Sequence, residues 1–250
     1  MPENHTEKWT EIELLPEWDE EFYDIYTAKK FGKWVMFKTL KKQYRDDPRF
    51  IAMIEKEFDV RYNLSHPNII MINDYEDIPG VGMSIVTDDV YGLSLRKLIE
   101  KGEVTRHHVD QICNRLTDAI DYIQRNHIVH FPITPDTIVF TENIGNLKLI
   151  DVGFDQNSHL TPAEASEDIR NFGKVLTAAL DAANINDPHL RTIAERCESL
   201  NPYERFGSLH KLRLAIERRS DRGLYITIAC LIAVVAALLV WVLTGNGPRP

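Results

Sequence analysis

The chain has 250 residues, 44% of them hydrophobic, which is enough for one two-lobed domain or two small domains with an ordinary core. Its formal net charge of -9 at pH 7 excludes nucleic acid as an expected partner. Cys113, Cys197 and Cys230 fit neither a metal-ligand spacing nor a disulfide framework, which favours a reducing compartment. The first fifteen residues contain no apolar core, so the sequence predicts no secretory signal.

The first third of the chain predicts strands around one helix. Trp34–Lys38 is a short apolar run that predicts a buried strand, and Ile69–Met71 and Met83–Thr87 predict two more. Between them, the large apolar side chains of Pro48–Leu64 recur at helical spacing, with Glu57 among them. This part of the chain therefore predicts a small β-rich unit that contains one helix.

Helical spacing dominates the second part of the chain. Thr105 is the expected N-cap of a long helix that continues to Ile123, and Asp168–Ala182 predicts another helix. A β-hairpin is predicted where Ile138–Phe140 and Leu147–Ile150 flank a turn rich in asparagine. A strand-rich part followed by a helix-rich part predicts an α+β fold with a cleft between the two parts.

The segment Leu224–Leu243 contains no charged residue and has the length needed to cross about 30 Å of hydrocarbon as a helix. Tyr225 and Trp241 near its ends are typical of residues at a membrane interface. The alternative is a buried core helix, which would be expected inside polar sequence rather than near the end of the chain. We therefore expect one transmembrane helix.

The charges that flank this segment predict its orientation. Basic residues precede it and Arg249 alone follows it, and positive residues favour the cytoplasmic side. The preceding basic residues are Lys211, Arg213, Arg218, Arg219 and Arg222. We expect a single-pass, tail-anchored protein whose N-terminal domain lies in the cytoplasm. Residues 219–223 would then lie beside the membrane, and residues 244–250 would form a short extracytoplasmic tail.

Seven short motifs also occur one after another along the chain. The motifs are Val35–Lys38, Leu64–Ile70, Ile85–Gly92, Ile128–Ile138, Lys148–Gly153, Asp168–Gly173 and Pro202–Phe206. In this order they resemble the protein kinase superfamily, of the Hanks-type Ser/Thr class, over nearly all of Glu11–Arg218. The resemblance implies a bilobal α+β kinase-like fold with a small lobe over about residues 11–90, a helical lobe over about 91–218, and an N-terminal extension over 1–10.

The resemblance implies a nucleotide site between the lobes. In the family pattern, Lys38 would touch the phosphates, Glu57 would hold Lys38 in place, and Asp151 would hold one metal ion. Thr87 would be the gatekeeper, and the backbone from Asp88 to Val90 would contact an adenine.

Three positions of the catalytic loop depart from the family pattern. Pro132, Thr134 and Thr137 stand where the resemblance implies a catalytic aspartate, a lysine near the transferred phosphoryl group and a metal-binding asparagine. Proline carries no proton acceptor on its side chain, and a general base typically contributes about 10² to 10⁴ in rate. The sequence therefore predicts a catalytic loop that lacks the side chains needed for phosphoryl transfer.

Other members of the pattern are implied to be structural. His130 and Asp168 occupy places that are architectural in the family, and Arg205 belongs to its late arginine motif. Thr161–Glu164 resembles a remnant of the motif that closes the activation segment. In that case Glu164 would pair with Arg205; the alternative is that Glu164 is a solvated charge.

The segments around the expected site are also altered. Trp18–Ile25 contains no glycine where a glycine-rich phosphate loop is implied, and Asp19, Glu20 and Glu21 would add negative charge beside a triphosphate. The stretch from Asp151 to Asp168 is too short for a regular activation segment with a peptide-docking loop. Both changes weaken the expectation of nucleotide and substrate binding.

The retained residues Lys38, Glu57 and Asp151 support two interpretations. They could bind ATP with Mg²⁺ weakly, or Lys38 and Glu57 could form an ion pair that fixes the helix against the sheet while Asp151 caps a turn. We favour the structural interpretation, because three catalytic-loop residues and the glycine-rich loop of the family pattern are lost. Removal of one partner of a buried pair would leave an uncompensated charge, which is a reason for both to be kept.

The sequence predicts a membrane-anchored pseudokinase that acts as a signalling scaffold or allosteric partner. Its expected partner is a cytoplasmic or membrane signalling protein, and it would not be an enzyme. One alternative is an atypical active Ser/Thr protein kinase that uses Lys38 and Asp151 and takes its base from Asp136 or Asp155. A second alternative is a nucleotide-binding sensor without phosphotransfer.

Overall fold

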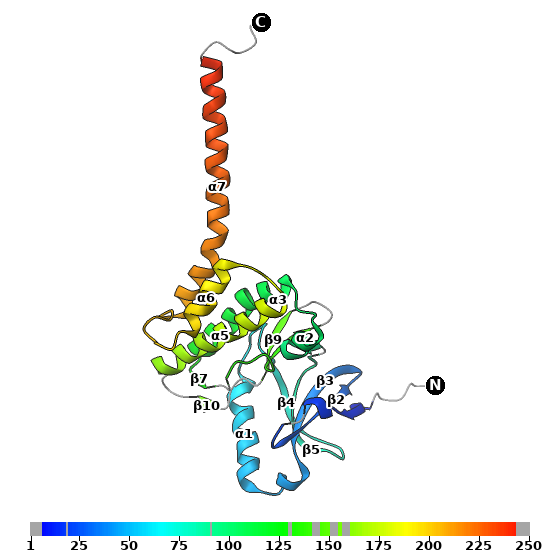
Figure 1. Ribbon diagram of the computed structural model, residues 1–250. Helices are drawn as coiled ribbons and strands as arrows, with labels where there is room; N and C mark the ends of the chain where they lie inside the picture. Colours follow the sequence, from blue (N-terminus) through cyan, green and yellow to red (C-terminus); the bar gives the residue numbers. More distant parts are fainter. Residues whose placement is uncertain are drawn as a thin grey trace, which may run out of the picture.

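The computed structural model describes residues 7–18, 20–90, 92–129, 132–141, 146–150, 155–156 and 161–243. Among these, residues 17, 129, 155, 156, 218–225, 242 and 243 are described by their backbone alone. The strands of the first part form one lobe, and the helices of the second part form another (Figure 1). The last helix, α7, extends from the helical lobe in the direction away from the first sheet (Figure 1).

The small lobe is built on an antiparallel five-stranded sheet of order β1-β2-β3-β5-β4. Its strands are β1 (Trp9–Leu14), β2 (Tyr23–Lys30), β3 (Lys33–Leu40), β4 (Ile72–Ile78) and β5 (Gly82–Asp88). Its helices are α1 (Pro48–Tyr62) and two 3₁₀ turns, η1 (Pro16–Trp18) and η2 (Lys42–Tyr44). In the register, Lys38 of the central strand β3 lies between Ile25 of β2 and Ile85 of β5.

The predicted strand at Ile69–Met71 is wrong, whereas those at Trp34–Lys38 and Met83–Thr87 lie within β3 and β5. Ile69 makes an isolated bridge to the large lobe, and the strand begins only at Ile72. The apolar run reflects burial between lobes, since Ile69 belongs to the core of the large lobe and Ile70 to that of the small lobe. The polar sequence of β4 concealed the strand, because β4 is an edge strand with partly exposed faces.

The large lobe combines helices with short strands. Its helices are α2 (Leu95–Lys101), α3 (Arg106–Gln111), the π-helical turn η3 (Ile112–Leu116), α4 (Thr117–Arg125), α5 (Pro162–Ala182), α6 (Pro188–Glu198) and α7 (Leu209–Leu243). Its strands are β6 (Gly92–Ser94), β7 (Ile128–Val129), β8 (Ile138–Thr141), β9 (Leu147–Leu149) and β10 (Asp155–Gln156). The predicted hairpin is confirmed, because β8 and β9 pair antiparallel.

The two long helices predicted for this lobe are confirmed, with changed details. Thr105 is the N-cap of a helical run that continues through η3 to Arg125. The helix predicted from Asp168 begins earlier, at Pro162, because Thr161 and Glu164 form a capping box there. The face of α5 that carries Phe172 lies in a single apolar core with α4 and α6.

Helix α7 begins in the core of the large lobe and leaves it. Leu209 and Leu212 are buried, and Arg213 pairs with Asp118 of α4. Beyond the lobe, the apolar side chains from Ile226 to Trp241 are exposed. No helix in the described part of the chain is apolar over a length sufficient to cross a membrane. The expected span, 224–243, and the basic stretch 219–223 include residues whose side chains lie outside the described set.

The close packing of α5 on α6 predicts the effect of a small substitution. A Cβ added at Gly173 of α5 would lie 2.6 Å from Cys197 Cβ and 2.9 Å from Glu198 Cγ. We expect Gly173→Ala to lower the free energy of unfolding by about 1–3 kcal/mol through overpacking. Gly207→Ala is the matched control, because its Cβ would meet only Lys211 Nζ at 3.8 Å. Urea unfolding of both variants checks this, and equal stabilities would contradict the packing described here.

Candidate functional site

The structure brings Lys38 and Glu57 together, as expected. Lys38 lies on β3 and Glu57 lies on α1, and Lys38 Nζ is 2.8 Å from Glu57 Oε1. Their side chains are 8% and 2% exposed, so the pair is shielded from solvent. A buried pair of this kind ties the helix to the sheet, because either charge alone would be costly to bury.

A second cation, Arg61, contacts the same carboxylate. It lies one turn after Glu57 on α1, is buried, and donates a hydrogen bond to Glu57 Oε1. Burial acts to raise the pKa of Glu57, but the positive charges of Lys38 and Arg61 outweigh it, and the pKa lies below its ordinary value. Glu57 is therefore ionised at neutral pH, and it neutralises part of the charge of both cations.

A second carboxylate, Glu20, reaches Lys38 from the other side. Glu20 lies between η1 and β2, and its Oε2 is 3.7 Å from Lys38 Nζ. Lys38 Nζ also lies 4.4 Å from the centre of the Tyr23 ring. Burial and the nearby Glu57 and Glu20 raise the pKa of Tyr23, which keeps its hydroxyl protonated. We name Glu20, Lys38, Glu57 and Arg61 the charge cluster.

The sequence predicted that Glu20 brings negative charge to the site, but it did not predict the direction in which its side chain turns. The acidic stretch was expected to repel a triphosphate from a loop at the mouth of the site. In the structure, Glu20 turns toward the lysine itself, whereas Glu21 is exposed. Asp19 lies outside the described residues. No pattern in the sequence distinguishes Glu20 from its neighbours, because the choice depends on how the chain turns between η1 and β2.

The charge cluster lies at a cavity with about 480 Å³ of empty volume, part of it open to solvent. The cavity is lined by Trp18, Glu20, Ile25, Met36, Phe37, Lys38, Arg61, Ile70, Thr87, Val90 and Ile150. Most of these side chains are apolar, and they come from both lobes. A largely apolar lining with a few charged groups is typical of a small-molecule site.

Two of the expected gatekeeper and hinge residues lie at this cavity. Thr87 and Val90 line it. The Thr87 hydroxyl lies 3.3 Å from the Met36 carbonyl oxygen and 3.1 Å from that of Asp88, so it bonds within the protein. The Asp88 N–H donates to Met71 O at 3.3 Å, and its carboxylate accepts from Asn73. The Asp88 N–H therefore already has an acceptor, Met71 O, within the protein.

Hydrogen bonds between Thr134 and Thr137 close a turn in the segment predicted to be the catalytic loop. Pro132 is exposed. The Thr134 N–H donates to the Thr137 hydroxyl at 3.1 Å, and that hydroxyl lies 3.1 Å from Thr134 O. These bonds give Thr137 the role of closing a turn. His130 and Asp151, the expected architectural histidine and metal ligand, lie outside the described residues.

Asp136 and Asp155 are the carboxylates that the active-kinase alternative takes as its base. Asp136 forms a two-bond ion pair with Arg96, at 3.1 and 3.2 Å, on the surface of the large lobe. Because Arg96 occupies both of its oxygens, the Asp136 carboxylate is not free to act as a general base. The side chain of Asp155 lies outside the described set. Asp168 accepts a hydrogen bond from Gln124 at 2.8 Å, as suits a structural residue.

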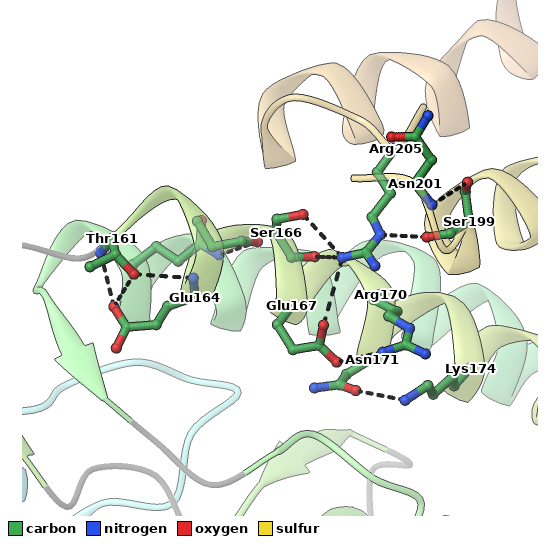
Figure 2. Close-up of polar contacts among 12 residues, drawn as sticks. Thr161, Glu164, Ser166, Glu167, Arg170, Asn171, Lys174, Ser199, Asn201 and Arg205 are labelled. Carbon is green, nitrogen blue, oxygen red and sulfur yellow. Dashed lines mark hydrogen bonds and ion pairs between the residues drawn. The ribbon is translucent and has the colours of Figure 1, made fainter. Parts of the chain in front are cut away.

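The expected pairing of Glu164 with Arg205 is wrong. Glu164 accepts hydrogen bonds from the Thr161 N–H and hydroxyl at 2.9 and 2.7 Å, which closes the N-terminus of α5 (Figure 2). These bonds lower the pKa of Glu164. The alternative of a merely solvated charge is also wrong. The sequence pattern misled because Glu164 and Glu167 lie one turn apart on α5, and spacing alone does not show which of them reaches Arg205.

Arg205 instead pairs with Glu167, whose Oε2 lies 3.6 Å from Arg205 Nη1 (Figure 2). The buried guanidinium also donates to Ser199 O at 2.7 Å, to Ser166 O at 3.2 Å and to Ser166 Oγ at 3.1 Å. It thereby joins the start of α5 to the loop after α6. Two of its acceptors are backbone carbonyls, which a sequence pattern cannot reveal.

A pair of double-mutant cycles checks these assignments. We expect Arg205→Ala and Glu167→Ala to couple by about 0.5–1 kcal/mol, because they remove one half-exposed ion pair. Arg205→Ala and Glu164→Ala should add within about 0.5 kcal/mol, because they act on separate contacts. The measurement is urea unfolding of the single and double variants. A larger coupling of Arg205 to Glu164 than to Glu167 would contradict the contacts in the structure.

Comparisons with known proteins agree with this geometry. The protein kinase domain family model matches residues 22–171, which is 150 of the 250 residues. The chain is similar to the serine/threonine-protein kinase PrkC of Bacillus subtilis, with 31% identity over 133 residues, 52% of this chain and 20% of PrkC. It is also similar to the serine/threonine-protein kinase PknD of Mycobacterium tuberculosis, with 30% identity over 124 residues, 47% of this chain and 18% of PknD.

The solved structures agree in fold. The kinase domain of Mycobacterium tuberculosis PknI superposes with a TM-score of 0.62 at 19% identity, over 86% of this chain and 97% of that domain. This likeness shows the bilobal fold alone. The curated relatives are Ser/Thr kinases in name, and this chain spans about a fifth of their length. With the family model matched over more than half of its residues, the chain belongs to the protein kinase family.

Proposed function

We propose that this member of the protein kinase family is a pseudokinase that acts as a signalling scaffold or allosteric partner. The observation that carries the proposal is Pro132 at the place of the catalytic aspartate. A proline side chain accepts no proton, and loss of a general base removes about 10² to 10⁴ in rate. The names of the relatives support a kinase domain, and Pro132 distinguishes this chain from an ordinary kinase.

Two further features support inactivity. Thr134 brings no positive charge to a transferred phosphoryl group, and the Thr137 hydroxyl is bonded inside the loop rather than directed to a metal. Helix α5 begins at Pro162, so only ten residues separate it from Asp151. That length leaves little chain for docking a peptide substrate.

The active-kinase alternative has weaker support. Its candidate base Asp136 is held by Arg96 in a two-bond ion pair on the surface of the large lobe, a position that suits a structural role. The nucleotide-sensor alternative is favoured by one observation, the apolar cavity beside Lys38. A sensor would bind a ligand there without transferring phosphate.

We also propose that α7 anchors the domain to a membrane, with the kinase-like domain in the cytoplasm. The support is the exposure of its apolar side chains: Ile226, Ile232 and Val240 are each at least 60% exposed. Such a surface is unstable in water and is stabilised by lipid. The basic residues before the segment favour the cytoplasmic side for the domain. The proposed partners are cytoplasmic or membrane signalling proteins.

Catalysis is tested with the full chain, radiolabelled ATP, Mg²⁺ or Mn²⁺ and a general protein substrate. We expect the label transferred by the wild-type protein to equal that of Lys38→Ala, because neither has a base at residue 132. An active kinase assayed in parallel is the positive control. Transfer that depends on Lys38 would refute the pseudokinase proposal and favour the active alternative.

Membrane anchoring is tested by fractionating cells that express the chain. We expect the protein in the membrane fraction after a carbonate wash. Val234→Lys combined with Val235→Lys should move it out, because each lysine at the centre of a span costs about 2.5–3.5 kcal/mol. Leu214→Lys is the matched control, since Leu214 is an exposed residue of α7 beside the lobe. Equal behaviour of the two variants would exclude a span at this segment.

A further inference from the structure

The turn between β2 and β3 is held in a conformation that its residues do not favour. Lys30 pairs with Lys33, so Phe31 and Gly32 alone form the turn, with φ values of +49° and +80°. Turns of this kind favour Asn-Gly or Asp-Gly, and an aromatic residue at a positive φ is strained. The Phe31 N–H donates to Lys8 O at 2.9 Å, which helps to hold the turn. Because backbone strain persists mainly at functional positions, this turn is a candidate for a contact outside the lobe.

The same turn exposes aromatic and basic side chains. Phe31 is 63% exposed and Trp34 is 40% exposed, and Lys29 Nζ lies 4.8 Å from the centre of the Trp34 ring. Lys33 is exposed and forms no ion pair within the described part of the chain. Phe31 belongs to none of the apolar cores found among the described residues, so packing within the small lobe does not offset its strain. We name Phe31, Lys33 and Trp34 the hairpin tip.

The outer face of α1 carries complementary side chains. Glu55, Phe58, Asp59 and Tyr62 recur at helical spacing, so they lie along one side of the helix. The centre of the Phe58 ring is 4.8 Å from that of Tyr62 and 5.2 Å from that of Tyr75 on β4. Tyr62 is 52% exposed, and Glu55 and Asp59 are exposed without an ion pair among the described residues. We name Glu55, Phe58, Asp59 and Tyr62 the acidic stripe.

The hairpin tip and the acidic stripe do not meet within one molecule. Lys38, which pairs with Glu57 of α1, lies five residues after Lys33 on β3, or about 17 Å along the strand at roughly 3.4 Å per residue. Figure 1 shows α1 on one side of the small lobe, β2 and β3 extending toward the other side, and α7 pointing away from the lobe. The anchor proposed for α7 would hold all copies in one membrane with their small lobes at the same height. The hairpin tip of one copy could then reach the acidic stripe of the next.

We infer that this chain associates with itself, with the hairpin tip of one copy on the acidic stripe of the next. Phe31 packs on the rings of Phe58 and Tyr62, and Lys33 pairs with the carboxylates of the stripe. Each copy uses different surfaces on its two sides, so the association is head-to-tail and forms rows or rings rather than a closed pair. The contact involves few residues, and a shared membrane strengthens it by raising the local concentration. The inference goes beyond the proposed function and does not depend on whether phosphate is transferred.

The test cross-links two tagged forms of the full chain that are co-expressed in intact cells. One form carries Lys8→Cys beside the hairpin tip, and the other carries Asn63→Cys beside the acidic stripe; both positions are exposed. Cys230→Ser in both forms removes the exposed native cysteine. A short bismaleimide should link the two forms to each other and neither form to itself. In the control pair, Glu103→Cys in the large lobe replaces Asn63→Cys and should give no product. With Lys8→Cys and Asn63→Cys on one chain, the products should form a ladder of species larger than a dimer.

Further substitutions in both forms of this pair identify the contacts. Lys33→Glu should lower the cross-linked fraction by about threefold or more, because like charges then face each other. Adding Glu55→Lys and Asp59→Lys should restore the fraction, because the charges are again opposite. Phe31→Asn should lower cross-linking but raise the melting temperature, since asparagine suits the turn; a loss of fold would lower both. Lys101→Glu makes the same charge change at an exposed residue of the large lobe and should leave cross-linking unchanged.

The inference would be overturned by no cross-linking between the two forms, by equal cross-linking of the control pair, or by products of one form with itself. Failure of the reversed charges to restore cross-linking would also overturn it. Cross-linking is carried out before the cells are fractionated, so a failed contact and a failed membrane anchor give different results. The phosphotransfer assay tests the pseudokinase proposal separately.

Discussion

The small lobe depends on one buried electrostatic arrangement, in which Glu57 of α1 is shared by Lys38 of β3 and Arg61 of its own helix. Each partner alone would be a costly buried charge, so the three hold helix and sheet in one relative position. Glu20 extends the arrangement to the chain before β2. Lys38 and Glu57 therefore have a structural role in the small lobe that does not depend on phosphoryl transfer.

In the large lobe, residues of the predicted kinase motifs also make structural contacts. Helix α5 begins at Pro162 with the Thr161–Glu164 capping box, which closes its first turn. Arg205 then pairs with Glu167 and binds backbone carbonyls. In the catalytic loop, Thr137 closes a turn with Thr134. These contacts hold neighbouring segments of the large lobe together.

The helices and strands could largely be predicted from the sequence, because their patterns depend on residues that are close together along the chain. Helical spacing located α1 and α4, and apolar runs located β3 and β5. Prediction failed where the answer depends on contacts across the fold. Edge strand β4 carries little apolar signal, and Ile69 owes its burial to the junction between lobes. The inward turn of Glu20 and the choice of Glu167 over Glu164 depend on distances of a few ångströms that no spacing rule contains.

Helix α7 has a mechanical consequence. It is a single helix of 35 residues, about 52 Å long at 1.5 Å per residue, and it starts inside the core of the large lobe at Leu209. Its sequence contains no proline and one glycine, Gly223. A stiff rod of this kind transmits torque, so a turn of its far end about its own axis reorients the lobe by the same angle. Gly223 is the position of lowest helix propensity along the rod, and thus the point where the rod would bend first.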